Sequence, residues 1–228
     1  MTVSMMSETV FGTLVIGDKT YSSWSMRPWL VLKQAGAVFA EQKVGLYGPN
    51  KLADLTTVSP TGLVPLLRVG DLDIPDSLAI SEYVAEAFPE AGLWPQDRSA
   101  RAMARAATCE MHSGFTALRS QHPHHLFHRS HPTPSPEVTR ELTRLVALWR
   151  SLRHRFGGAG PFLFGPFGIV DAFFTPVASR LRTYHLDPAQ FGDEDGVAAA
   201  YAAALLANPH FLEWEADACT EGHGTGWA

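Results

Sequence analysis

Residues 64–88 read VPLLRVGDLDIPDSLAISEYVAEAF, and this stretch decides the fold of the first part of the chain. Val64 to Pro75 predicts two strands, because apolar residues flank Gly70-Asp71, a pair typical of a hairpin turn. A helix is expected to follow at once over Asp76 to Phe88, with Asp76 as its N-cap. The stretch therefore predicts a ββα unit.

The residues before this unit alternate between strand and helix signals. Thr13 to Gly17 and Glu41 to Tyr47 predict strands, Met26 to Gly36 predicts the helix between them, and Lys51 to Val58 predicts a short helical piece. Pro28 is expected in the first turn of its helix, where a missing N–H has no intrahelical partner. Residues 11–90 therefore predict one α/β domain of the order βαβαββα.

The second part of the chain has helical signals alone. Pro89 to Asp97 is rich in Pro and Gly and predicts a connection. The helices expected beyond it are Arg98 to Arg119, one that starts at Ser135-Pro136, Ile169 to Tyr184, and Val197 to Trp214. Residues 98–228 therefore predict an all-helical domain.

Composition limits the partners. The chain has 228 residues, 46% hydrophobic, with a formal net charge of −5, so no basic field favours nucleic acid or an anionic membrane. No signal peptide or long apolar run is present, which predicts a cytoplasmic protein with a frayed tail before Thr13. Cys109 and Cys219 lack a metal or redox spacing, so we expect two buried thiols in a reducing compartment.

Proline stands where the third strand should begin. A cis Val64-Pro65 bond would turn the Val64 backbone outward, where its N–H and C=O could pair with an extended peptide ligand. A trans turn proline is the commoner alternative.

Asp76-Ser77 opens the next helix. Free N–H groups and the helix dipole there favour a ligand carboxylate, while Asp76 could hold an ammonium group. The alternative is that Asp76 and Ser77 only cap the helix. A ligand that ends in an α-amino acid, with both an ammonium and a carboxylate group, could bind to both residues.

The stretch YSSWSMRPWL, residues 21–30, places three serines before a helix. A thiol at such a helix start would be shifted toward thiolate by the dipole and by donated hydroxyl hydrogen bonds. Ser25 alone could cap the helix, which leaves Ser22 and Ser23 for chemistry.

Other polar residues have two interpretations each. Arg27, Arg180 and Arg182 could meet an acidic group of a substrate or could be structural. The run QHPHHLFHRSHPTPSP, residues 121–136, could bind zinc or nickel, but without carboxylate or cysteine a flexible loop over the cleft is favoured and no metal is expected.

Taken together, SSWSMRPWLVLKQAG, SPTGLVPLL, DSLAISEYVAE and GPFLFGPFGIVDAFFTPVASRLRTY resemble the cytosolic glutathione transferases over nearly the whole chain. The resemblance implies a thioredoxin-like domain over residues 11–90, a helical substrate-binding domain over residues 98–228, and a cytoplasmic homodimer. It also implies glutathione as co-substrate. The residues implied to bind glutathione are Leu63, Val64, Pro65, Asp76, Ser77 and Lys51.

The SSxS pattern followed by arginine is similar to the zeta class. The resemblance ranks Ser22 first and Ser23 second for activating the thiol, with Tyr21 as an alternative. Trp24 stands where zeta members carry cysteine, and Thr183 stands where they carry a substrate arginine, with Arg182 one residue away. Gly168 before Asp171 weakens the capping box usual in the family. The pocket for the second substrate is expected to include Trp24, Met111, Ser113, Phe115, Arg119 and Arg182.

These features predict a transferase of the detoxification type that activates glutathione for attack on a small electrophile. The alternatives are a cis-trans isomerase of the maleylacetoacetate type and a non-enzymatic relative that only binds. A thiol-disulfide oxidoreductase is disfavoured, because serines replace the cysteine that it needs at the helix start.

Overall fold

The computed structural model describes residues 10–46, 51–158 and 160–221. Its first part is built from β1 (Thr13–Ile16), α1 (Ser23–Gln34), β2 (Ala40–Lys43), β3 (Leu66–Val69), β4 (Leu72–Pro75) and α2 (Ser77–Ala87). The sheet order is β2-β1-β3-β4, with β1 and β2 parallel and the other pairs antiparallel. This is the predicted α/β unit. The expected helical piece before β3 is a single 3-10 turn, Leu55–Thr57, and the expected strand end at Tyr47 lies outside the described residues.

Side chains of β1 divide the core between the two faces of the sheet. Leu14 and Ile16 point to the face covered by α1 and α2, and Val15 points to the opposite face, where it packs with Val44 and Leu66. This alternation follows from the two-residue period of a strand. The larger core is continuous with that of the helical half.

Helix α1 begins earlier than the sequence predicts. Its N-cap is Ser22, not Ser25, because the Ser22 hydroxyl oxygen accepts from the Ser25 N–H at 3.3 Å. Pro28 consequently lies inside the helix and not in its first turn, and the helix lacks the N–H that would donate to the Trp24 carbonyl. The prediction was wrong because three candidate capping serines stand in one short stretch.

The helical half contains α3 (Arg98–Ser113), α4 (Thr116–Gln121), α5 (Pro136–Phe156), α6 (Ile169–Thr183), α7 (Val197–Leu206) and α8 (Pro209–Thr220). Two expected continuous helices are broken. The first breaks at Gly114-Phe115, where buried Phe115 has a φ of 51°. The second breaks at Asn208-Pro209, where the Asn208 side chain caps a new helix. Both breaks are set by tertiary packing and local capping that helical periodicity does not reveal.

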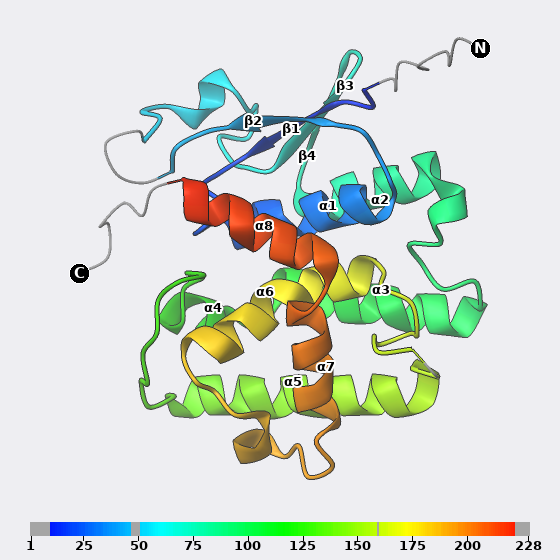
Figure 1. Ribbon diagram of the computed structural model, residues 1–228, viewed down its shortest axis with the longest axis vertical. Coiled ribbons are helices and arrows are strands. Elements are labelled where there is room, and N and C mark those ends of the chain that lie inside the picture. The colour runs from blue at the N-terminus through cyan, green and yellow to red at the C-terminus, as the bar shows by residue number, and fades with distance from the viewer. Residues whose placement is uncertain (1–9, 47–50, 159, 222–228) are drawn as a thin grey trace, which may run out of the picture.

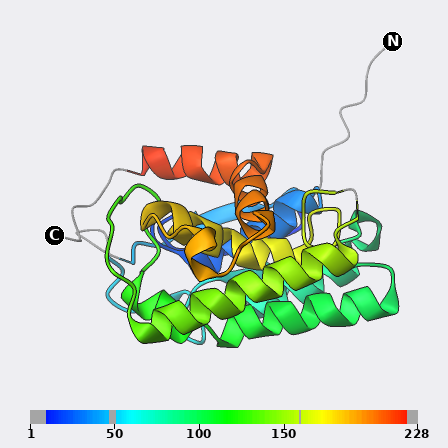
Figure 2. The ribbon, with the colours of Figure 1, turned by 90° about the horizontal axis from the view of Figure 1, so that it is seen from below.

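Helix α6 lies at the centre of the helical half and packs against α1, α3 and α7 (Figures 1 and 2). Helix α8, red in Figure 1, returns to the α/β half and packs beside α1. Buried Lys19, just before α1, pairs with Asp217 of α8 at 2.6 Å and with Glu41 at 3.0 Å. The two halves are therefore held together by shared apolar core and by ion pairs.

Two further expectations are corrected. Cys109 and Cys219 are exposed, because each lies on the outer face of its helix. The histidine run is not a free loop over the cleft at its start: His122 and His124 are buried, the His122 carbonyl accepts from Arg180 of α6, and His124 lies 3.2 Å from the Ser179 hydroxyl. Among the described residues, no three His, Cys, Asp or Glu side chains form a group that could hold a metal ion.

No helix within the described ranges is both long and apolar enough to span a membrane.

Asp171 fixes the start of α6 and carries a stability prediction. It is fully buried, and its carboxylate accepts from the Gly168 N–H at 2.9 Å, the Leu163 N–H at 3.2 Å and the Tyr201 hydroxyl at 2.8 Å. The carboxylate half of the capping box is thus present, as expected from the sequence. Burial raises the pKa of Asp171 to about 6, from an unfolded value of 3.8.

Because the folded pKa of Asp171 is raised, its contribution to stability is complete below about pH 4 and is lost as the pH rises through about 6. We expect the free energy of unfolding of the wild type, relative to Asp171→Asn, to fall by on the order of 2 kcal/mol over this window. Urea unfolding at a series of pH values measures the difference. Parallel profiles for the two proteins would contradict the prediction.

Candidate active site

A cleft of about 440 Å³ lies where the two halves meet. It is lined by Trp24 of α1, by Thr61, Leu63, Val64 and Pro65 before β3, by Pro75, Asp76 and Ser77 at the start of α2, and by His112 of α3. Six residues predicted for the site lie in this lining: Trp24, Leu63, Val64, Pro65, Asp76 and Ser77.

The Val64-Pro65 peptide bond is cis, as the ligand-binding interpretation of this proline requires. Strand β3 begins only at Leu66, which pairs with Val15 and with Pro75. Val64 therefore lies outside the ladder and in the cleft wall.

Asp76 caps α2, as predicted, from an unusual backbone conformation with a φ of 76°. Its Oδ1 accepts from the N–H groups of Leu78 at 2.7 Å and Ala79 at 3.3 Å, and its Oδ2 lies 3.2 Å from Nε2 of His112. A non-glycine residue at this φ is strained by about 1–3 kcal/mol, which is tolerated where the surroundings require it. The side chain remains half exposed in the cleft, so it is available to a ligand cation.

Ser77, the next residue, is 1% exposed, and its hydroxyl oxygen has no hydrogen-bond partner among the described residues. Buried hydroxyls nearly always have a partner. The unpaired hydroxyl stands at the first turn of α2, beside N–H groups that favour an anion.

His112 was not predicted, although Met111 and Ser113 on either side of it were. Successive residues of a helix point about 100° apart, and His112 alone of the three faces the cleft: Met111 is fully buried, and the Ser113 hydroxyl donates to the Cys109 carbonyl. Burial lowers the pKa of His112, with Asp76 opposing the shift. A neutral His112 donates from Nε2 to Asp76, and its Nδ1 then has no partner among the residues described by the structure.

The serines of α1 differ in their hydrogen bonds. The Ser22 hydroxyl donates to the Ser25 hydroxyl oxygen at 2.7 Å, and Ser25 also accepts from the Gly17 N–H at 3.1 Å. The Ser23 hydroxyl oxygen accepts from Nη2 of Arg180 at 3.4 Å. Ser22 is thus engaged as cap and donor, whereas Ser23 accepts from a cation and keeps its own hydrogen.

Three arginines, Arg27, Arg119 and Arg180, lie close to one another near Trp24. Arg27 is 0% exposed, its guanidinium carbon lies 4.0 Å from the centre of the Trp24 ring, and Arg119 approaches the same ring at 5.2 Å. Arg180, also buried, has its pKa lowered to about 10 by desolvation. The sequence predicts Arg119 for the substrate pocket and gives Arg27 and Arg180 two interpretations each.

Arg182 and Lys51 do not line this cleft. Arg182 forms a two-nitrogen ion pair with Glu215 of α8, so its charge is already matched. Lys51 is exposed. Neighbouring positions on one helix face different sides, which is why Arg180 points inward and Arg182 outward.

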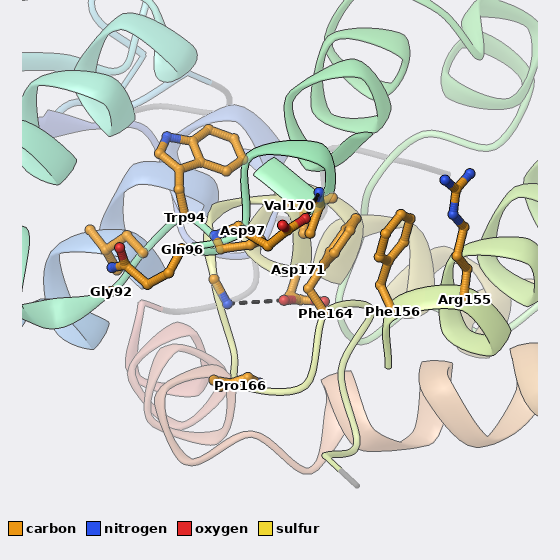
Figure 3. A pocket seen from close by; sticks show the side chains of 14 residues that line it. Gly92, Trp94, Gln96, Asp97, Arg155, Phe156, Phe164, Pro166, Val170 and Asp171 are labelled. Carbon is orange, nitrogen blue, oxygen red and sulfur yellow. Dashed lines mark hydrogen bonds between the residues drawn. The ribbon is translucent and has the colours of Figure 1, made fainter. Parts of the chain in front are cut away.

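A second cavity of about 560 Å³ lies between the connection after α2 and the start of α6 (Figure 3). Its walls include Trp94, Phe156, Phe164 and Asp171, whose carboxylate is bonded to Gly168. None of the predicted site residues lines it. The smaller cleft is the better candidate because unpaired polar groups converge there.

Residues 21–87 match the family model described as "Glutathione S-transferase, N-terminal domain". Glutathione S-transferase 1 of Dianthus caryophyllus is 42% identical over 82 residues, which cover 36% of this chain and 36% of that protein. The probable maleylacetoacetate isomerase of Caenorhabditis elegans is 34% identical over 98 residues, or 43% of this chain and 45% of that protein. The chain thus spans less than half the length of these curated relatives. The residues that match the family model lie in the α/β half.

Solved structures resemble the whole fold. A glutathione transferase homologue from Burkholderia gl BGR1, crystallised with bound glutathione, superposes with a TM-score of 0.68 at 23% identity, covering 92% of this chain and 99% of that one. Poplar glutathione transferase F1 superposes with a TM-score of 0.69 at 15% identity, covering 92% and 99%. The chain therefore has the fold of these proteins, with a thioredoxin-like first part and a helical second part.

Proposed function

Because residues 21–87 match the N-terminal domain model of the glutathione S-transferases, we propose that the chain is a member of this family, binds glutathione in the 440 Å³ cleft and transfers it to a small electrophile. The observation that carries this proposal is the Asp76-Ser77 pair: a half-exposed carboxylate next to a buried, unpaired hydroxyl at a helix start. An ammonium group suits Asp76, and a carboxylate suits Ser77 and the N–H groups of α2. The γ-glutamyl end of glutathione carries both.

We place the rest of the glutathione peptide along the cleft wall. Val64, outside the ladder, offers its backbone to an extended ligand in the manner of an added strand. The cysteinyl sulfur then lies toward the start of α1. We propose residues 11–90 as the glutathione-binding domain and residues 98–228 as the domain that binds the second substrate, in a cytoplasmic homodimer.

We propose Ser23 as the residue that activates the thiol, in place of the sequence-based ranking of Ser22 above it. The Ser23 hydroxyl oxygen accepts from Arg180, which polarises the hydroxyl and leaves its hydrogen for the sulfur. Together with the dipole of α1, this donor lowers the thiol pKa from about 8.5. The thiol proton goes to solvent.

The chemical step with a chloronitroaromatic acceptor is a substitution. The thiolate forms a carbon–sulfur bond at the carbon that carries chlorine, the carbon–chlorine bond breaks, and chloride leaves with the bonding electrons. The chain supplies proximity and thiolate stabilisation. Neither exposed cysteine lines the cleft, so a mixed disulfide with the protein does not enter this scheme.

Isomerisation of a maleyl ketoacid is the second candidate, because a relative named probable maleylacetoacetate isomerase is 34% identical to this chain over 98 residues. It would use the same thiolate, adding to a double bond and leaving after rotation. Thr183, at the position of the zeta-class substrate arginine, is buried and donates to the His125 carbonyl. Conjugation is therefore ranked first.

Calorimetry with glutathione and a turnover panel test the proposal on the full chain. We expect glutathione to bind with a dissociation constant below about 1 mM, a free energy of about −4 kcal/mol or better, and to be consumed with a chloronitroaromatic. Rapid turnover of a maleyl ketoacid with no conjugation would instead favour isomerisation. No binding at millimolar glutathione would overturn both functions.

A further inference from the structure

Arg27 is a buried cation without a hydrogen-bond partner in the part of the chain that the structure describes. It is 0% exposed, and none of Nε, Nη1 and Nη2 has a hydrogen-bond partner among the described residues. Its neighbours are the rings of Trp24, at 4.0 Å, and Phe173 of α6, at 5.0 Å. Cation–π contacts offset part of the lost hydration, but they leave the five N–H donors of a guanidinium unmatched.

The charges around Arg27 destabilise its buried guanidinium further. Burial, Arg180 and Arg119 all lower the pKa of Arg27, and Asp76 is the carboxylate that opposes them. Asp76 is already bonded to Leu78, Ala79 and His112. A cation that is buried close to other cations and has no anion beside it strongly destabilises the folded state.

Arg180 and Arg119 differ in how many of their N–H groups already have hydrogen-bond partners. Arg180 donates to the carbonyls of His122 and Pro176 and to the Ser23 hydroxyl. Arg119 has a buried Nε without a partner. Glu141 acts on the charge of Arg119, but its two oxygens accept from the N–H groups of Ala117 and Leu118. Of these three arginines, Arg27 and Arg119 therefore have buried N–H donors that find no partner within the described ranges.

Trp24 connects these donors to the cleft. Its ring contacts the guanidinium groups of both arginines and also forms part of the cleft wall beside His112. Ser23, the proposed sulfur contact, is the next residue and is held by Arg180. An anion that reached Arg27 past the partly exposed Trp24 ring would lie beside the sulfur, on the α1, α4 and α6 side of the cleft.

We propose that Arg27 and Arg119 form a binding site for a carboxylate of the electrophilic acceptor, so that the second substrate is a small electrophilic carboxylic acid. The identity of the acceptor rests on the proposed function; the anion site does not. A planar carboxylate matches the geometry of the guanidinium fork. The glutathione carboxylate is proposed at Ser77 and α2, on the other element of the cleft, which leaves the Arg27 site to the acceptor.

Binding of succinate without glutathione tests the site directly. Calorimetry compares the wild type with Arg27→Met, Arg119→Gln and a control, Arg140→Gln, whose side chain is 73% exposed on α5. We expect succinate to bind the wild type and Arg140→Gln equally, and each of the other two variants at least about tenfold more weakly, the loss of one charge-assisted pair. No binding to the wild type, binding of inorganic phosphate in its place, or equal affinity in all four proteins would overturn the proposal.

Thermal unfolding separates this role from a structural one. Replacing an unpaired buried cation with an apolar side chain of similar length should leave Tm unchanged or raise it. A Tm of Arg27→Met well below that of the wild type would assign Arg27 to the framework and overturn the proposal. Arg119→Gln, at a partly exposed position, keeps the test open if Arg27→Met does not fold.

Steady-state kinetics then test whether the carboxylate in the Arg27 site belongs to the acceptor. The acceptors 4-chloro-3-nitrobenzoate and 4-chloro-3-nitrobenzamide share the reacting carbon and differ in charge. We expect the ratio of their kcat/KM values, acid over amide, to fall at least about tenfold in Arg27→Met and Arg119→Gln. An unchanged ratio, or a matching loss of glutathione affinity, would overturn the assignment to the acceptor. Arginine-dependent succinate binding in a protein that binds no glutathione would overturn the proposed function and leave the anion site standing.

Discussion

Ser23→Ala should lower kcat/KM for glutathione conjugation by about 10²–10³-fold, the usual effect of removing one donor to a developing or resident anion. The Ser23 hydroxyl is polarised by Arg180 and keeps a hydrogen for the sulfur. Without it, the pKa of the bound thiol should rise toward about 8.5, its value in free cysteine. Thiolate absorbance of the glutathione complex, titrated with pH, measures that shift alongside turnover.

Ser22→Ala is the matched control for this prediction. Ser22 caps α1 and donates to Ser25, so its loss should lower the free energy of unfolding by about 1 kcal/mol and leave the thiol pKa low. If Ser22→Ala removed activity and raised the thiol pKa while Ser23→Ala did neither, the ranking drawn from the resemblance would be restored and the one proposed here would be wrong.

Asp76→Asn should weaken glutathione binding by about 10–100-fold, because it removes the charge proposed to hold the ammonium group. Asparagine caps helices about as well as aspartate and tolerates a positive φ better than most residues. The variant should therefore keep its contacts to Leu78 and Ala79 and unfold within about 0.5 kcal/mol of the wild type. Calorimetry and urea unfolding on the same preparation check both parts.

Two comparisons make the Asp76 prediction sharper. Asp76→Ala should lose affinity and also stability, since it removes the cap and places alanine at a φ of 76°. Ser77→Ala should bind glutathione more weakly but unfold with the same free energy as the wild type, because the buried Ser77 hydroxyl has no partner among the described residues. Wild-type affinity in Asp76→Asn would remove Asp76 from the proposed glutathione site.

The sequence predicted the helix that Asp76 caps and the hairpin before it, because each is a local signal. Strand alternation, a turn pair and a capping residue act over a few neighbours. The same local logic failed at the start of α1, where three serines could each cap a helix, and at Phe115, where a buried aromatic side chain holds a φ that propensity does not predict. It also missed His112, because no periodicity in α3 shows which of three adjacent residues faces a cleft built by other elements.

The sequence by itself thus determined the α/β and helical halves and the residue that caps α2, and it predicted Asp76-Ser77 and Ser22-Ser23 for the site. Only the tertiary structure decided which serine keeps a free hydroxyl hydrogen and which arginines have unpaired donors among the residues that the structure describes. Ser23 and Arg180 are 157 positions apart in sequence, and whether a charge is matched depends on every group that packs around it. Hydrogen bonding and desolvation are properties of that packing, which no local pattern records.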